Sequence, residues 1–259
     1  MKKPLILVTN DDGITAPGLR VLIQVMKEIG EVVVVAPDSP QSGMGHAITI
    51  DSTLYSKKVV IDHEKGAPSE YSCSGTPADC VKLGLQEILD RKPDICISGI
   101  NHGSNASINV IYSGTMSAAI EAGIEGIPAI GFSLCDYSWD ADFSHARDSI
   151  KKIVQEALAQ GIPKGTVLNV NIPKTDTAPK GIKVCRQARA NWKEQFDKRT
   201  SPTGKDYYWL SGEFELLDKG EDTDEWALAQ GYISVVPTQF DLTAHHAISR
   251  INNWNLNEA

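Results

Sequence analysis

The chain has 259 residues, of which 41% are hydrophobic and 22% charged, and its formal net charge is −8 at pH 7. These proportions are typical of a soluble globular protein and exclude a disordered chain. The net negative charge, without a run of Lys or Arg, excludes polymeric nucleic acid as an expected partner. No apolar stretch approaches the ~20 residues that span a bilayer, so no membrane partner is expected.

The first segments of the chain predict a βαβ unit. Residues 5–9 form a short, continuously apolar run, which is typical of a strand buried in a parallel sheet. Apolar residues recur at helical spacing from Leu19 to Ile29, and Gly30 is a helix stop. Residues 31–36 then predict a second buried strand. Between Ile48 and Cys73, two alternating segments, residues 49–51 and 58–61, predict an inserted β hairpin.

The alternation of strands and helices continues. Thr76 is expected to cap a helix that runs to about Leu89. Strands are expected at residues 95–98, 129–133 and 167–171, and helices at 115–125 and 144–160. The order predicts an α/β fold with a Rossmann-like, doubly wound and mostly parallel sheet, in a core of residues 1–178.

The pattern changes after Pro179. Residues 182–185, 207–210 and 232–236 predict antiparallel strands, separated by the polar stretches 198–206 and 218–225. We therefore expect a smaller, β-rich C-terminal part at residues 179–259. A two-stranded hairpin is at best marginally stable alone, so these strands are expected either to fold back on their own core or to cross to a second subunit.

The cysteines indicate a reducing compartment. They are five in number and lack CxxC spacing, which fits reduced thiols in the cytosol and argues against a zinc site made of cysteines. A cytoplasmic protein is therefore expected.

Two adjacent acids follow the first predicted strand. Asn10-Asp11-Asp12-Gly13 comes directly after it, and ligands of open α/β sheets bind beyond the carboxyl ends of strands. Adjacent carboxylates repel each other unless a cation compensates, so Mg²⁺ or Mn²⁺ is the expected occupant. The same residues are also good turn formers, and this motif alone supports a solvated turn equally well.

Three further polar loops favour a site over a simple turn. Residues 36–46 are rich in glycine and hydroxyl groups and include Ser42 and His46. Residues 99–105 include Asn101 and Asn105, and amide oxygens can ligate a hard cation. Residues 112–115 open a helix, and free N–H groups at a helix N-terminus bind phosphate.

Together these segments resemble the SurE family of survival-associated 5′/3′-nucleotidases. The resemblance is carried by residues 9–13, 42–46, 75–80, 98–105 and 112–115. It implies one divalent metal ion per subunit, Mg²⁺ or Mn²⁺, and C-terminal arms that form a homodimer or homotetramer. It implies Asp11 and Asp12 as catalytic residues and metal ligands, Ser42 and Asn101 as further metal ligands, and Asn10, Asn105, Ser113, Gly114 and Thr115 as substrate-binding residues.

The expected reaction is the hydrolysis of nucleoside 5′-monophosphates, with 3′-monophosphates and short polyphosphate as further candidate substrates. A metal ion can position water for in-line attack on phosphorus, and His46, His102 and His245 are candidate general acids. A side chain introduced at Gly114 is expected to obstruct the phosphate while leaving metal affinity largely intact.

Two other functions remain open. One is a metal-dependent hydrolase of another bond, such as the nucleoside N-glycosidic bond. The other is a nucleotide-binding module without hydrolysis, which predicts a GxGxxG turn where this chain has Asn-Asp-Asp-Gly. Trp192 and the run from Tyr207 to Trp209 could stack a nucleobase, although aromatic residues on strands are more often core or interface residues.

Overall fold

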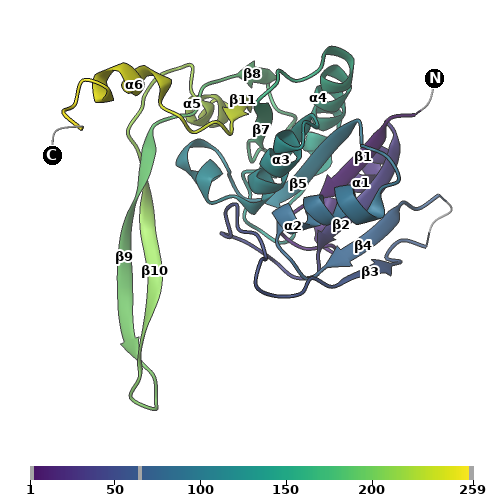
Figure 1. Cartoon of the computed structure of the whole chain (residues 1–259), viewed down its shortest axis with the longest axis horizontal. Coiled ribbons are helices and arrows are strands. Elements are labelled where there is room, and N and C mark those ends of the chain that lie inside the picture. The colour runs from purple at the N-terminus through teal and green to yellow at the C-terminus, as the bar shows by residue number, and fades with distance from the viewer. Residues whose placement is uncertain (1–2, 64–65, 257–259) are drawn as a thin grey trace.

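The computed structural model describes residues 3–63 and 66–256, and its centre is one nine-stranded sheet (Figure 1). The strands of this sheet are β1 (Leu5–Thr9), β2 (Glu31–Pro37), β3 (Ser56–Val59), β4 (Ser69–Cys73), β5 (Ile95–His102), β6 (Ala129–Leu134), β7 (Thr166–Ile172), β8 (Ile182–Val184) and β11 (Ile233–Gln239). Their order is β3-β4-β2-β1-β5-β6-β7-β11-β8. The six strands from β4 to β7 are parallel, which confirms the predicted mostly parallel sheet.

Helices cover both faces of the sheet. Successive side chains of β1 point to opposite faces of the sheet: Ile6 and Val8 belong to one buried apolar cluster, and Leu7 belongs to the other. The first cluster includes α1 (Pro17–Lys27) and α4 (Arg147–Gln160), and the second includes α2 (Pro77–Leu83) and α3 (Gly114–Ile124). The predicted doubly wound arrangement is therefore confirmed. No helix in residues 3–63 and 66–256 is long and apolar enough to cross a membrane.

The inserted hairpin lies between Ile48 and Cys73 as predicted, and its first strand overlaps the predicted segment 58–61, but the other strand is not at residues 49–51. β3 and β4 pair antiparallel, and β4 also pairs with β2, whereas residues 49–51 form no strand. The backbone N–H and the hydroxyl of Thr49 both donate to the Asp79 carboxylate, at 3.1 and 2.6 Å. The segment thus satisfies its polar groups at the start of α2 rather than on a neighbouring strand, so the prediction for residues 49–51 is wrong.

The C-terminal part contributes to two sheets. β11 pairs antiparallel with β7, but β8 pairs parallel with β11, so the expectation of antiparallel strands throughout this part is wrong. β9 (Ala190–Thr200) and β10 (Asp206–Leu216) form a separate hairpin that projects from the core (Figure 1). Part of the stretch 198–206, expected as a loop, lies within β9. The division at residue 178 stays a prediction, although two strands beyond it join the main sheet.

The base of the hairpin is attached to the loop that follows β5. Asp224, the first residue of α5 (Asp224–Ala229), is fully buried and accepts hydrogen bonds from the backbone N–H groups of Ser107 and Ala188, both at 2.8 Å. The indole N–H of Trp192 donates to the side-chain oxygen of Asn109 at 2.9 Å. The hairpin therefore begins at a fixed point on the loop that leads into α3.

Candidate active site

Asp11 and Asp12 lie at the carboxyl edge of the sheet, directly after β1. The Asp11 side chain is buried, and its Oδ1 accepts a hydrogen bond of 2.5 Å from the hydroxyl of Thr115 on α3. Asp12 Oδ2 accepts a 3.1 Å hydrogen bond from the backbone N–H of His102, at the end of β5. Burial and then the charge of Asp12 raise the pKa of Asp11 to about 6, and burial also raises the pKa of Asp12.

The donor set at this edge fits a hard divalent cation. The charge of Asp12 raises the pKa of Asp11, and the hydrogen bonds that the two carboxylates accept come from the Thr115 hydroxyl and the His102 backbone, not from a Lys or Arg. Asn10 Oδ1 is buried, and within the described residues it has no hydrogen-bond partner. Buried carboxylates are unfavourable unless a cation neutralises them, and oxygen ligands suit Mg²⁺ and Mn²⁺. Because residues 3–63 and 66–256 contain no cluster of three His, Cys, Asp or Glu side chains, a metal here needs neutral oxygen ligands as well.

The two other predicted ligands, Asn101 at the end of β5 and Ser42 on a loop, lie on segments that are hydrogen-bonded to the acidic loop. Asn101 donates from its side-chain nitrogen to the Gly103 carbonyl at 2.9 Å, so its amide oxygen is the atom that it offers to a cation. Ser42 is exposed, and its neighbour Gln41 donates its backbone N–H to the Asp11 carbonyl at 2.7 Å. The structure thus ties the Ser42 loop and the end of β5 to the acidic loop.

The predicted anion-binding turn packs directly against Asp11. Ser113 caps α3, since its hydroxyl accepts a 3.0 Å hydrogen bond from the backbone N–H of Met116. A Cβ added to Gly114 would lie 2.8 Å from Asp11 Cβ and 2.9 Å from Asp11 Oδ2. A side chain at this position would therefore displace Asp11 itself. If Asp11 is a metal ligand, as predicted, a substitution of Gly114 would disturb the metal site as well as the phosphate, contrary to the expectation from the sequence.

Asn105 and Asn10 hold the loops in place. The backbone N–H of Asn105 donates to Asn171 Oδ1, and its side-chain nitrogen donates to the Ser133 hydroxyl, both at 2.8 Å. Asn105 is thus joined to β6 and β7 in a buried polar network, and a role in substrate binding stays a prediction. Asn10 donates to the Gly13 carbonyl at 2.9 Å and shapes the acidic loop.

A buried carboxylate that the sequence analysis missed fixes the Ser42 loop. Glu121 on α3 is only 3% exposed, and its two oxygens contact His46 Nε2 at 2.8 Å and Lys82 Nζ at 2.6 Å. The hydroxyl of Thr76, the cap of α2, also donates to the Ala47 carbonyl at 2.7 Å. The signal available in the sequence was an acid placed between Ile120 and Ala122 in the middle of the predicted helix.

The three candidate general acids occupy different environments. His46 is paired with Glu121, as described, and His245 lies on α6 (His245–Ile251) with Asp241 Oδ2 at 3.0 Å. His102 contacts the acidic loop. Its Nδ1 lies 2.8 Å from the Ser138 carbonyl and must donate to it, while its buried Nε2 has no hydrogen-bond partner.

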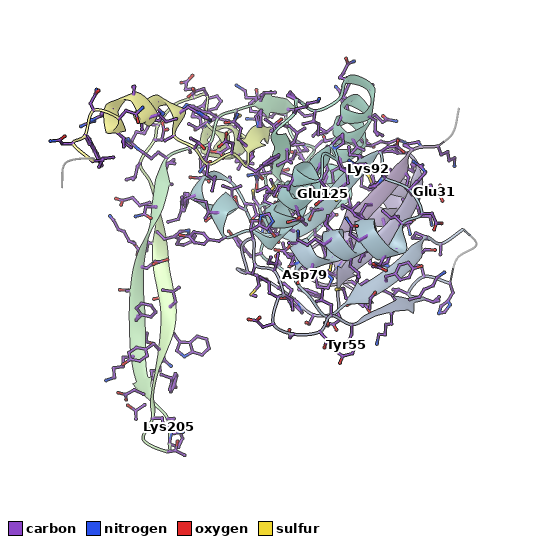
Figure 2. All side chains as sticks on the ribbon, viewed as in Figure 1. Glu31, Tyr55, Asp79, Lys92, Glu125 and Lys205 are labelled. Atoms are coloured by element: carbon purple, nitrogen blue, oxygen red, sulfur yellow. The ribbon has the colours of Figure 1, made fainter. Side chains whose placement is uncertain are left out.

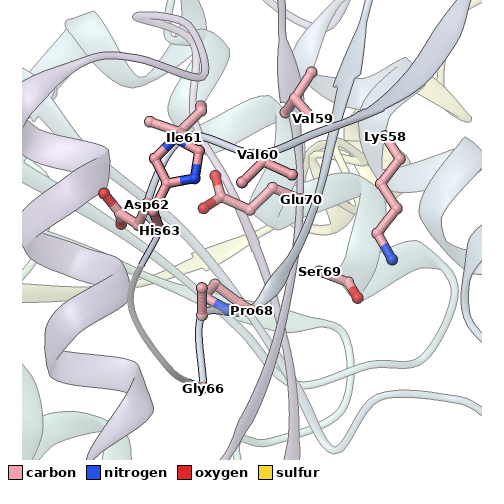
Figure 3. A pocket seen from close by; sticks show the side chains of 11 residues that line it. Lys58, Val59, Val60, Ile61, Asp62, His63, Gly66, Pro68, Ser69 and Glu70 are labelled. Carbon is pink, nitrogen blue, oxygen red and sulfur yellow. The ribbon is translucent and has the colours of Figure 1, made fainter.

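A cavity of about 410 Å³ lies elsewhere, between the strands of the β3–β4 hairpin and the segment that joins them (Figure 3). It is lined by residues 58–63 and 66–70. The start of β4 pairs with the first half of β2, so this cavity is at the amino-terminal edge of the parallel strands, opposite Asp11 and Asp12. It is not part of the candidate site.

Comparisons with known proteins agree with this geometry. The family model described as survival protein SurE matches residues 6–194. The chain is 70% identical to the 5′-nucleotidase SurE of Flavobacterium psychrophilum, with 100% of both chains covered, and 46% identical to that of Phocaeicola vulgatus, with 98% of both covered. The crystal structure of the SurE protein from Aquifex aeolicus is 41% identical, has a TM-score of 0.82, and is matched over 96% of this chain and 98% of that one. The resemblance first indicated by the polar loops is thereby confirmed, and the chain belongs to the SurE family.

Proposed function

We propose that the protein is a 5′-nucleotidase that hydrolyses nucleoside monophosphates to nucleoside and phosphate. Nucleotide phosphatase activity is supported by the full-length relatives that carry this name. The structural observation that carries the proposal is the contact between Asp11 and the start of α3. A cation-binding carboxylate and a phosphate-binding helix N-terminus there adjoin each other, as a phosphomonoester bound to a metal ion requires.

One divalent cation, Mg²⁺ or Mn²⁺, is part of this proposal, with Asp11, Asp12, Ser42 and Asn101 as its protein ligands. When bound, it supplies Lewis-acid polarisation of the phosphoryl group. Thr115 holds the Asp11 carboxylate and the His102 backbone holds that of Asp12, so both ligands are oriented in advance. The absence of a side chain at Gly114 lets Asp11 pack against the start of α3, where backbone N–H groups of the helix N-terminus can bind an anion.

The decisive assay compares the two products that distinguish phosphatase from N-glycosidase activity. The purified protein is incubated with 5′-AMP, 3′-AMP and short polyphosphate, and inorganic phosphate and free adenine are both measured. We expect phosphate release from 5′-AMP, loss of activity with a chelator, and recovery with Mn²⁺ or Mg²⁺. Release of adenine in place of phosphate would contradict the proposed reaction, and full activity after exhaustive chelation would contradict the metal.

We also propose a cytoplasmic homodimer or homotetramer. The five cysteines are free thiols, which fits a reducing compartment. The hairpin exposes large apolar side chains, including Phe196 at 67% and Trp209 at 61%, that a second subunit would cover. Light scattering tests this part, because a monomer mass that persists at high micromolar concentration would contradict it.

A further inference from the structure

The loop after β6 carries two exposed aromatic side chains beside the candidate active site. Trp139 is 60% exposed and Tyr137 is 71% exposed. The Trp139 ring stacks on the imidazole of His102, with centroids 5.4 Å apart and planes inclined by 14°. Tyr137 lies over Gly103, where an added Cβ would come within 2.4 Å of its ring. Both aromatic residues therefore contact the residues that directly follow the predicted ligand Asn101 at the end of β5.

His102 links the Trp139 ring firmly to the acidic loop. Its backbone N–H donates to Asp12 Oδ2, its Nδ1 donates to the Ser138 carbonyl, and Phe143 packs edge-on at a centroid distance of 5.0 Å. Imidazole covers one face of the indole, and the other face contributes to the exposed area. The indole of Trp139 is thus held against His102, the residue whose backbone N–H donates to the Asp12 carboxylate.

The aromatic residues considered from the sequence do not offer such a surface within the same subunit. Trp192 is engaged by Asn109 and packs edge-on against Phe214 at 5.5 Å. Tyr207 and Trp209 follow Lys205, which Figure 2 shows at the far tip of the hairpin, well away from Asp79 on the core. The ring contacts made with His102 come from Trp139 and Phe143, both on the segment that follows β6.

The geometry points to Trp139 as the nucleobase platform of the proposed nucleotidase, with His102 as the residue that supports it. A base stacked on the exposed indole face would belong to a nucleotide whose phosphate lies against Asp11 and the start of α3. Stacking recognises the π face that every base possesses and reads no hydrogen-bond pattern. The platform therefore accepts purines and pyrimidines, with larger bases bound more tightly. This inference rests on the proposed function.

A pair of substrates that differ only in the base provides the test. 5′-AMP and ribose 5-phosphate present the same phosphate ester, but the second has no ring to stack. We expect Trp139→Ala to lower kcat/KM for 5′-AMP by about 10- to 100-fold, mainly through KM, because base–aromatic stacking has this magnitude. Activity towards ribose 5-phosphate should change little, and Trp139→Phe should restore most of the activity towards 5′-AMP.

Controls separate stacking from structural roles. Trp254→Ala removes an equally exposed tryptophan near the C-terminus and should leave both substrates unaffected. Mn²⁺ affinity and the oligomeric mass of Trp139→Ala should equal those of the wild type. Equal loss of activity on both substrates would show that Trp139 only holds His102 in place, and a smaller oligomer would show that a second subunit covers the ring. Either result overturns the inference.

A binding measurement keeps the inference independent of catalysis. Stacking of adenine should quench the tryptophan fluorescence of the wild type, and this quenching should be absent from Trp139→Phe. If the wild type hydrolyses neither substrate, the proposed function fails, whereas quenching by 5′-AMP but not by ribose 5-phosphate would still support the platform. Equal quenching of wild type and Trp139→Phe by 5′-AMP would refute it.

Discussion

Replacing Asp11 with Asn should make the metal-free protein more stable at neutral pH. Burial and the neighbouring Asp12 raise the pKa of Asp11 from an ordinary value of 3.8 to about 6. At ~1.4 kcal/mol per pKa unit, holding this carboxylate ionised in the folded state costs about 3 kcal/mol. Asparagine retains the oxygen that accepts the hydrogen bond from Thr115, so the substitution removes the charge with little change in packing.

The pH dependence of this effect follows from the direction of the shift. Because the folded-state pKa is the higher one, the penalty is fully present above the folded value of about 6 and fades as the pH falls towards 3.8. The gain in stability from Asp11→Asn should therefore be largest at neutral pH and roughly half as large near pH 5.

Urea unfolding with a chelator present measures the effect, and the exposed Asp51→Asn is a control with the same change in charge. Saturating Mn²⁺ should reverse the order of stability, since binding stabilises the wild type and not the variant. If Asp11→Asn is no more stable than Asp51→Asn in chelator at neutral pH, the reasoning about Asp11 is refuted.

The other predictions concern the packing around the site. Gly114→Ala should weaken Mn²⁺ binding and phosphatase activity together, because the added Cβ would clash with Asp11. Mn²⁺ affinity is measured by calorimetric titration, and an affinity equal to that of the wild type would contradict this prediction. Glu121→Ala should destabilise the fold by about 1–3 kcal/mol and speed hydrogen exchange at residues 46–50, while Glu125→Ala, at the exposed residue that follows the same helix, should do neither. Replacing the distal part of the β9–β10 hairpin by a short turn should reduce the oligomeric mass, measured by light scattering, without unfolding the core. Truncation at Pro173 should unfold the core, because it removes β11 from the main sheet. Circular dichroism distinguishes the folded variant from the unfolded one.

The sequence predicted those elements whose signals are local. β1 and α1 could be located because a continuous apolar run and an apolar helical face depend only on near neighbours in the chain. The orientation of β8 could not be predicted, because its partner strand, β11, lies more than forty residues later in the chain. Residues 49–51 alternate like a strand, yet their hydrogen bonds are made with Asp79, which periodicity does not reveal.

In the candidate site, too, residues with a local sequence signal could be predicted and residues that act through distant contacts could not. Asp11, Asp12 and the helix start at Ser113 could be predicted because each follows a strand or opens a helix, and the sheet then gathers such positions at one edge. Glu121 and Trp139 belong to no local motif, and their roles depend on contacts with His46 and His102 that only the folded chain creates.

The attachment of the hairpin at Asp224 has a mechanical consequence. One buried carboxylate holds both the segment that leads into the hairpin, through Ala188, and the loop that leads into the predicted anion-binding turn, through Ser107. The lever arm is long, since each strand of the hairpin has 11 residues, and Ser107 lies six residues before Ser113. A force that rotates the hairpin would therefore act, through Asp224, on the segment that precedes the predicted anion-binding turn. If the proposed assembly forms through these hairpins, a displacement of the hairpin by a neighbouring subunit would be transmitted to the proposed phosphate-binding turn.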